Sequence, residues 1–241
     1  MAARTHILFD FFGTLVDYSA DRIGQDYAQS YQFLLDQGAG LTYDAFVQTW
    51  DQLFEQSEQQ GEASGIEFSL TDLCRHFLQQ TLDKRPAPAA VATLRDIYLA
   101  EWSRGVGYIP GVKEMLAALA ARHALVLLSN THHAALVHAH LSQGQMAAYF
   151  QHVVTSVEHG RRKPCRQIFD HALQVAGSTA ATAVFVGDSY TADYLGAQGA
   201  GISCFLIDPQ RQHPIPDACR LGHILALPAA MRGPGAGLKW D

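Results

Sequence analysis

The sequence lacks long apolar runs, paired cysteines and any excess of positive charge, and each absence excludes a class of protein. No window reaches the roughly 18 consecutive apolar residues of a membrane-spanning helix, so we expect no membrane segment. The chain carries 17 Lys and Arg against 23 Asp and Glu, a net charge of -6. Nucleic-acid-binding proteins normally show a basic face, so we expect no nucleic-acid partner.

Cysteine is scarce and scattered. The four residues Cys74, Cys165, Cys204 and Cys219 form no CxxC pair, which argues against a disulfide framework or a zinc site and indicates reduced thiols. The N-terminal stretch "MAARTHILFDFF" has only a short apolar segment before Asp10 and lacks the long apolar region of a secretory signal. We therefore expect a cytoplasmic protein.

Apolar residues are abundant, and in the first part of the chain they repeat at helical spacing. With 241 residues and 48% hydrophobic content, the chain can bury a sizeable core. Between about residues 20 and 102 we predict four helices. They cover residues 23–38, residues 46–54 after a Thr42 cap, a segment opened by the capping-box-like Ser69 to Asp72, and a segment after Pro88. This part holds fourteen Asp and Glu against five Lys and Arg between Asp17 and Glu101.

From Pro110 onward, helical and strand-like segments alternate. The strands are predicted at residues 124–130, 152–157, 183–188 and 203–208, and a final short strand at 222–231; the helices are predicted at 112–121, 132–141, 165–177 and 190–201. Continuous apolar strands separated by helices are typical of a parallel sheet covered on both faces. We predict an α/β fold with a doubly wound parallel sheet, formed by residues 1–17 and 103–241, and an all-helical cap domain inserted at residues 18–102.

Polar residues end the apolar runs of this predicted sheet. Strand C-termini converge on one crevice in a doubly wound fold, so these residues are expected to meet there. They are Asp10, Ser129, Asn130, Lys163, Asp188 and Asp193. Carboxylates suit Mg²⁺, lysine and hydroxyl groups suit phosphoryl oxygens, and a carboxylate can itself be a nucleophile. The pattern therefore indicates phosphoryl transfer.

Four segments resemble the motifs of the haloacid dehalogenase-like (HAD) hydrolase superfamily. They are "DFFGTLVD", "LLSNT", "SVEHGRRKPCRQIF" and "VFVGDSYTADYLGA", in this order and spacing, with the helical cap inserted after the first. The resemblance implies Asp10 as nucleophile and Mg²⁺ ligand. It also implies the following roles: the Phe12 backbone carbonyl, Asp188 and Asp193 at the metal site; Gly13 in the turn; Thr14, Ser129 and Asn130 for substrate; and Lys163 for charge neutralisation.

Phe12 departs from the phosphatase pattern. Phosphatases of this superfamily have there a second Asp that protonates the leaving group, a role worth about 10²- to 10⁴-fold in rate. The first choice is a Mg²⁺-dependent phosphatase acting on a small phosphorylated metabolite through an aspartyl-phosphate. Its leaving group would either need little protonation, as in an acyl phosphate, or take a proton from Asp17, Tyr18 or His76.

Three alternatives remain open. A 2-haloacid dehalogenase would have an aromatic residue at this position, but also an early cap arginine, for which only Arg22 is available, and no intact "GDSYTAD". A phosphonoacetaldehyde hydrolase would use a cap lysine, and the only one is Lys84. A non-catalytic binding protein of the same fold would have no need of Asp10, Ser129, Lys163 and Asp188 together.

The histidine-rich segment "THHAALVHAH" invites a zinc interpretation. His132, His133, His138 and His140 include no pair at the i, i+4 spacing of a helical metal site, so we expect a solvated helix face instead. The sequence makes no prediction about the oligomeric state.

Overall fold

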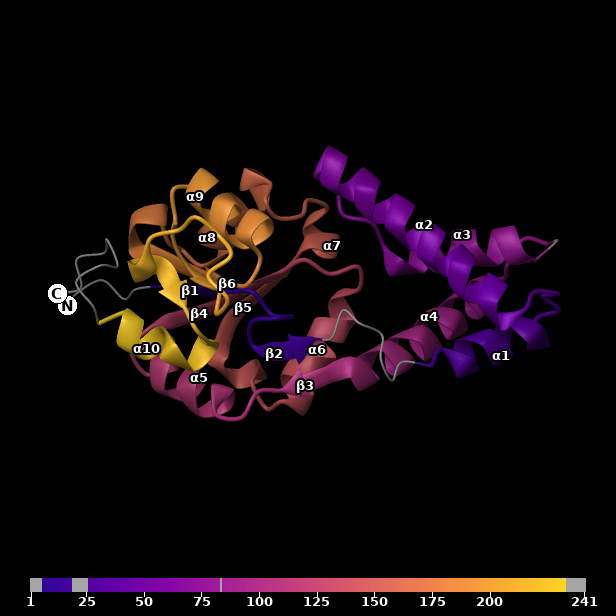
Figure 1. Cartoon of the computed structure of the whole chain (residues 1–241), viewed down its shortest axis with the longest axis horizontal. Coiled ribbons are helices and arrows are strands. Elements are labelled where there is room, and N and C mark those ends of the chain that lie inside the picture. The colour runs from indigo at the N-terminus through magenta and orange to yellow at the C-terminus, as the bar shows by residue number, and fades with distance from the viewer. Residues whose placement is uncertain (1–5, 19–25, 83, 233–241) are drawn as a thin grey trace. The chain divides into compact units, whose positions relative to one another are not determined.

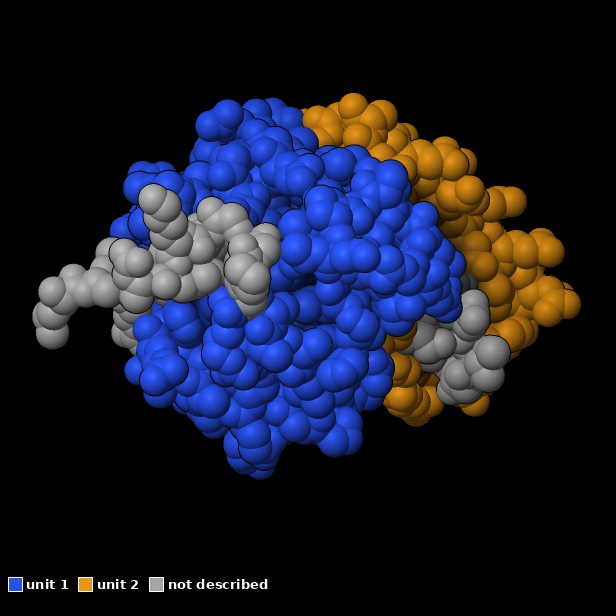
Figure 2. Space-filling model, turned by 60° about the vertical axis from the view of Figure 1, so that its left-hand side comes forward, with its two compact units in different colours: residues 1–17, 107–241 blue, residues 18–106 orange. Residues whose placement is uncertain are grey.

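The computed structural model describes residues 6–18, 26–82 and 84–232 (Figure 1). It divides into two compact units: unit 1 comprises 1–17 and 107–241, and unit 2 comprises 18–106 (Figure 2). The chain returns from unit 2 to unit 1 between Val106 and Gly107, four residues beyond the predicted end of the insertion at residue 102. Predictions that concern Arg22 and Ile23 lie outside the described residues.

Unit 1 is built on a six-stranded parallel sheet. Its strands lie in the order β5-β4-β1-β6-β7-β8. Their bounds are β1 His6–Phe9, β4 Ala124–Ser129, β5 Phe150–Thr155, β6 Ala183–Gly187, β7 Ser203–Ile207 and β8 Arg220–Leu221. All residues of β4 and β6 are buried, as expected for strands covered on both faces. The doubly wound parallel sheet is therefore confirmed.

Helices cover both faces of this sheet. Figure 1 shows α8 (Arg166–Val175) and α9 (Gly196–Gly199) over one face, and α5 (Val112–Ala120) and α10 (Leu227–Ala230) over the other. The remaining helices of unit 1 are α6 (Ala134–Gln143) and α7 (Ser156–His159), and a π-helical turn at Tyr190–Leu195 leads into α9. The core under α8 and α9 includes Leu8, Phe169 and Phe185.

The final strand predicted at 222–231 is wrong. The segment forms a short 3₁₀ turn at Ile224–Ala226 followed by α10, and the last strand is β8, just before it. Pro228 stands in the first turn of α10, where its missing N–H costs no helical hydrogen bond. Leu227 is still buried, so the apolar run contributes to the core as a helix rather than as a strand.

Unit 2 is helical, as predicted. Its helices are α1 (Ala28–Asp36), α2 (Tyr43–Ser64), α3 (Leu70–Thr81) and α4 (Pro88–Trp102). Thr42 caps α2 by accepting the Ala45 N–H, and Ser69 caps α3 by accepting the Thr71 N–H. The expected capping box at α3 is incomplete, because the Asp72 carboxylate pairs with Arg75.

The aromatic stripes of unit 2 form its core, as helical spacing predicts. The indole of Trp50 packs against Phe77 with ring centroids 5.1 Å apart, and against Tyr98 at 4.4 Å. No described helix has the length and apolar character needed to cross a membrane.

The two chain segments that connect the units pair with each other. Strands β2 (Val16–Tyr18) and β3 (Val106–Tyr108) form a separate two-stranded sheet, which the sequence analysis did not predict. A Cβ on Gly107 would lie 3.4 Å from the Cβ of Asp17, so the strands run in close contact there.

Candidate active site

The predicted nucleophile, Asp10, stands directly after the central strand β1. Its N–H donates to the Val186 carbonyl oxygen over 2.9 Å, which continues the pairing of β1 with β6 by one residue. The register of β1 against β4 pairs Phe9 with Leu127, so Ser129 lies one residue further along its strand than Asp10 does. Both side chains are largely buried at the same edge of the sheet.

The turn after Asp10 depends on Gly13. This residue has φ +84°, a conformation that favours glycine, and a Cβ there would overlap the Asp188 carboxylate. The turn brings Thr14 back toward the carboxylates. Its buried hydroxyl lies 3.1 Å from Asp10 Oδ2 and 3.2 Å from Asp188 Oδ1, so its single proton is donated to one or the other.

Lys163 comes from the loop between α7 and α8 and is buried. Its Nζ donates to Asp10 Oδ1 over 2.7 Å and to Asp193 Oδ1 over 2.6 Å. Burial alone would lower the pKa of Lys163, but the two carboxylates more than offset this effect and hold the pKa well above its usual value. The ammonium therefore stays charged and neutralises part of the cluster.

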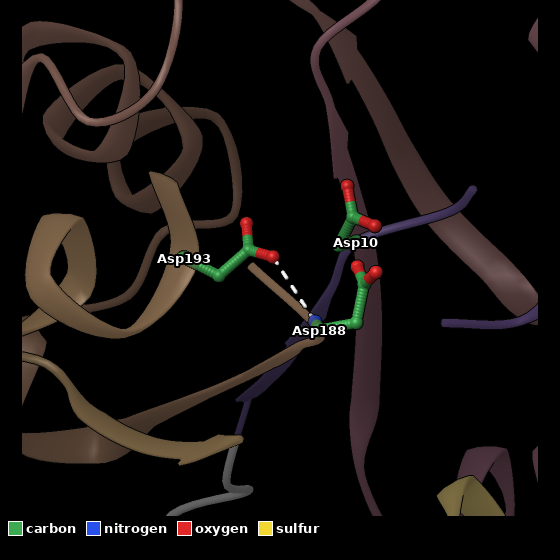
Figure 3. A group of neighbouring side chains, drawn as sticks. All are labelled: Asp10, Asp188 and Asp193. Atoms are coloured by element: carbon green, nitrogen blue, oxygen red, sulfur yellow. Dashed lines mark hydrogen bonds between the residues drawn. The ribbon is translucent and has the colours of Figure 1, made fainter. Parts of the chain in front are cut away.

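Both oxygens of the Asp193 carboxylate accept hydrogen bonds from protein groups. One oxygen accepts from Lys163, and the other accepts the Ser189 N–H over 2.9 Å. The second oxygen also accepts the Asp188 N–H over 3.1 Å (Figure 3). Asp193 thereby orients the loop that carries Asp188. Burial and the nearby Asp10 raise the pKa of Asp193 to about 6, although Lys163 opposes the shift.

Asp188 is exposed at the surface of the cluster. Desolvation, followed by the charges of Asp10 and Asp193, raises its pKa to about 7. Asp188 is exposed, so the crowding of three carboxylates is the main physical cause of this raised pKa. Figure 3 shows Asp10, Asp188 and Asp193 as neighbouring side chains. Each offers one carboxylate oxygen, and these three oxygens lie within 4.8 Å of one another.

These residues fit a divalent cation. Three carboxylates face one lysine, and hard oxygen donors are the ligands that Mg²⁺ prefers. Among the described residues this is the one group of three or more potential ligands close enough to share an ion. The histidine-rich segment forms no such group.

The solvated face expected for that histidine segment is wrong for His140. This residue is buried, and its Nδ1 lies 2.9 Å from the Tyr108 hydroxyl. Its ring also packs edge-on against Phe12, with centroids 6.1 Å apart. His140 follows Val137 by three residues on α6, and this spacing places both on the buried side.

Other predicted site residues have clear surroundings. The Ser129 hydroxyl donates to the Asn130 carbonyl oxygen over 3.3 Å, and both polar ends of the Asn130 side chain bond to the backbone of Lys163. Lys84 is exposed in unit 2 and its Nζ donates to the Gln37 carbonyl oxygen over 3.2 Å.

One contact at the site was not predicted. The Lys163 Nζ lies 5.1 Å from the centroid of the Phe185 ring, a cation–π contact beneath the carboxylates. Phe185 belongs to the apolar run of β6, and nothing in the sequence distinguishes it from the other core residues of that strand.

This chain is similar to known proteins in sequence and in fold. The sequence profile described as haloacid dehalogenase-like hydrolase matches residues 5–201. Ribulose-1,5-bisphosphate 5-phosphatase of Halopiger xanaduensis is 25% identical over 218 residues, 86% of each chain. Two solved structures are similar in fold. A 2-haloacid dehalogenase from Pseudomonas syringae pv. Tomato has a TM-score of 0.74 at 22% identity, and a HAD phosphatase from Thermococcus onnurineus has 0.67 at 20%; each match covers 95% of this chain and 98% of the other.

Proposed function

This chain belongs to the haloacid dehalogenase-like hydrolase family, and from that premise we propose that it is a Mg²⁺-dependent phosphatase acting on a small phosphorylated metabolite. The observation that carries the proposal is the acidic cluster of Asp10, Asp188 and Asp193 with Lys163 between two of its members. The relative from Halopiger, which spans most of the chain, is also named as a phosphatase.

In the proposed reaction, the Asp10 carboxylate attacks phosphorus while the bond to the leaving-group oxygen breaks. An aspartyl-phosphate forms, and water then attacks its phosphorus, releasing phosphate and restoring the carboxylate. Lys163 orients Asp10, because its ammonium donates to Asp10 Oδ1. With substrate bound, the hydroxyl groups of Thr14 and Ser129 would turn away from Asp10 or Asp188 and from the Asn130 carbonyl oxygen. They would then donate hydrogen bonds to the phosphoryl oxygens.

Asp10, Asp188 and the backbone carbonyl of Phe12 would hold Mg²⁺. When bound, the ion neutralises charge on the transferring phosphoryl group. Asp193 would support this metal site without binding the ion directly, since both its oxygens already accept hydrogen bonds from Lys163 and from the loop of Asp188. We further propose that unit 2 is the cap domain that selects the substrate.

Phe12 limits the substrates that suit this site. A phenyl ring transfers no proton, so the leaving group must depart as a stable anion or take a proton from another residue. An acyl phosphate meets the first condition because its leaving group is a carboxylate. Asp17, Tyr18 and His76 stay candidates for the second; all three are exposed within their units.

The deciding experiment measures hydrolysis by the purified protein with and without Mg²⁺. Substrates are acetyl phosphate, p-nitrophenyl phosphate, a panel of sugar phosphates and nucleotides, and L-2-chloropropionate, with Asp10→Asn as the matched variant. We expect phosphate release that requires Mg²⁺ and falls at least about 1,000-fold in Asp10→Asn. Chloride release without Mg²⁺ would favour the dehalogenase alternative, and no turnover of any substrate would favour a binding protein.

A further inference from the structure

The side chain of Asn130 makes two hydrogen bonds with the backbone of one residue, Lys163. Asn130 Nδ2 donates to the Lys163 carbonyl oxygen over 3.0 Å, and Asn130 Oδ1 accepts the Lys163 N–H over 2.8 Å. A primary amide can do both at once because it carries a donor and an acceptor side by side. The two residues are 33 positions apart, so the bonds join two separate loops.

The two loops differ in how firmly the fold holds them. Asn130 directly follows β4, a strand whose six residues are all buried. Lys163 lies between α7 and α8, in a loop that begins at the left-handed Gly160 and exposes Pro164. Through its two hydrogen bonds, Asn130 thus links the loop that carries Lys163 to the buried end of β4.

We propose that Asn130 is a positioning residue, which holds the backbone of Lys163 so that its ammonium stays between Asp10 and Asp193. Its amide is committed to this contact rather than to the substrate. A fixed backbone leaves the lysine side chain fewer conformations to lose when its Nζ makes the contacts of 2.7 and 2.6 Å. The kinetic part of the test below rests on the proposed phosphatase function, whereas the structural part does not.

A neighbouring pair of bonds supplies a matched control. The Ser156 hydroxyl accepts the Thr131 N–H over 2.9 Å and lies 3.2 Å from the Thr131 carbonyl oxygen. These two bonds also tie the loop after β4 to the segment after β5, and they run to Thr131 rather than to Lys163. Ser156→Ala therefore removes a comparable buried contact without releasing the lysine.

The structural test measures how fast the Lys163 amine reacts with trace acetic anhydride, followed residue by residue by mass spectrometry. In the wild type, burial of Lys163 keeps labelling slow relative to the exposed Lys84. Asn130→Ala is expected to raise the labelling rate of Lys163 by about 10-fold or more, since two hydrogen bonds are lost. Asn130→Asp keeps the acceptor and loses the donor, so its rate should be intermediate. Ser156→Ala should leave Lys163 at the wild-type rate.

The kinetic test separates positioning from substrate binding. Asn130→Ala should lower kcat about 10- to 100-fold while KM changes by less than about threefold. In a Lys163→Met background the same substitution should cause no further loss, because the two residues act together. If Asn130→Ala misfolds by circular dichroism, Asn130→Asp takes its place in both tests.

Two results would overturn the proposal: wild-type labelling of Lys163 in the Asn130 variants, or a raised KM with unchanged kcat. If the wild-type protein hydrolyses no substrate, the proposed function fails while the labelling experiment still decides the role of Asn130.

Discussion

Gly13 lacks a side chain for two separate physical reasons. Its φ of +84° strains any other residue, and a Cβ would also overlap the Asp188 carboxylate. Gly38 in unit 2 has a similar φ of +93° but nothing within 4 Å of its would-be Cβ. Substitutions at these two glycines therefore distinguish the effect of backbone strain from the effect of overlap with the Asp188 carboxylate.

Gly13→Ala should abolish most phosphatase activity and Mg²⁺ binding, because Asp188 must move. Gly38→Ala should keep both and lose only about 1 kcal/mol of unfolding free energy. Calorimetric titration with Mg²⁺ and denaturant unfolding measure the two effects. Equal Mg²⁺ affinity in the two variants would show that Asp188 does not hold the ion.

Phe12→Asp tests the role of the missing acid. The new carboxyl group would stand where leaving-group protonation takes place in the phosphatase branch. We expect the ratio of glycerol 3-phosphate to acetyl phosphate hydrolysis to rise about 10- to 100-fold, since only the alkyl leaving group needs a proton. Phe12→Leu, which removes the ring without adding an acid, is the control. The same ratio in both variants would mean that another residue already supplies the proton.

Among the helices, α1 is capped at its N-terminus by a residue of α4. Glu101 is fully buried and accepts the Gln29 N–H over 2.8 Å, the Ser30 N–H over 3.0 Å and the Ser30 hydroxyl over 2.6 Å. Tyr27, at the N-cap position, makes no side-chain cap. The carboxylate thus takes the place of a cap and lies at the positive end of the helix dipole.

Glu101→Ala should lower the free energy of unfolding by about 3 kcal/mol, because three donors, two of them on the buried Ser30, lose their acceptor. The loss should appear in urea denaturation and in faster amide exchange at Gln29 and Ser30. Asp96→Asn, at an exposed position on the same helix, should stay within about 0.5 kcal/mol of the wild type. If both variants were equally stable, the cap from Glu101 would contribute nothing.

Elements with strong local patterns were predicted well from the sequence. The apolar runs predicted the parallel strands, and Thr42 and Ser69 predicted where α2 and α3 begin. The run after Leu221 was misassigned because a short apolar segment looks alike as strand or helix. The β2–β3 pair was missed because its strands have three residues each and lie about ninety positions apart.

The site was predicted from strand ends, which topology brings together. Asp10, Thr14, Lys163 and Asp193 are linked by hydrogen bonds that extend from Asp10. The different surroundings of Asp188 and Asp193 could not be predicted, because both are aspartates of one motif. Only the geometry shows that both oxygens of Asp193 already accept hydrogen bonds. The same holds for Asn130, whose partner is set by the path of a distant loop.

Protonation of the acidic cluster affects the stability of the whole molecule. Asp188 and Asp193 have pKa values raised from 3.8 to about 7 and about 6, so the folded state binds more protons than the unfolded chain. Their contribution to stability therefore falls as pH rises from about 4 through 7. A bound cation relieves this repulsion, and it competes with the same protons.

Mg²⁺ should accordingly bind about tenfold more tightly at pH 8 than at pH 6, because ionisation of Asp188 is nearly complete only at the higher pH. The gain in Tm on adding Mg²⁺ should likewise be larger at pH 8. Titration calorimetry and thermal unfolding at both pH values measure these effects. Asp188→Asn should lose both the affinity and its pH dependence; an affinity that is equal at the two pH values would contradict the assignment of Asp188 as a ligand.

The pairing of β2 with β3 bears on how such a molecule can change over generations. The chain leaves unit 1 after Asp17 and re-enters it at Gly107, and these two points lie in contact within one ribbon. The two ends of the helical insertion lie next to each other. One insertion can therefore be exchanged for another without any change in the strand order of the six-stranded sheet. Under the proposed role of unit 2 in substrate selection, recombination at this ribbon would change the substrate preference and leave Asp10 in place.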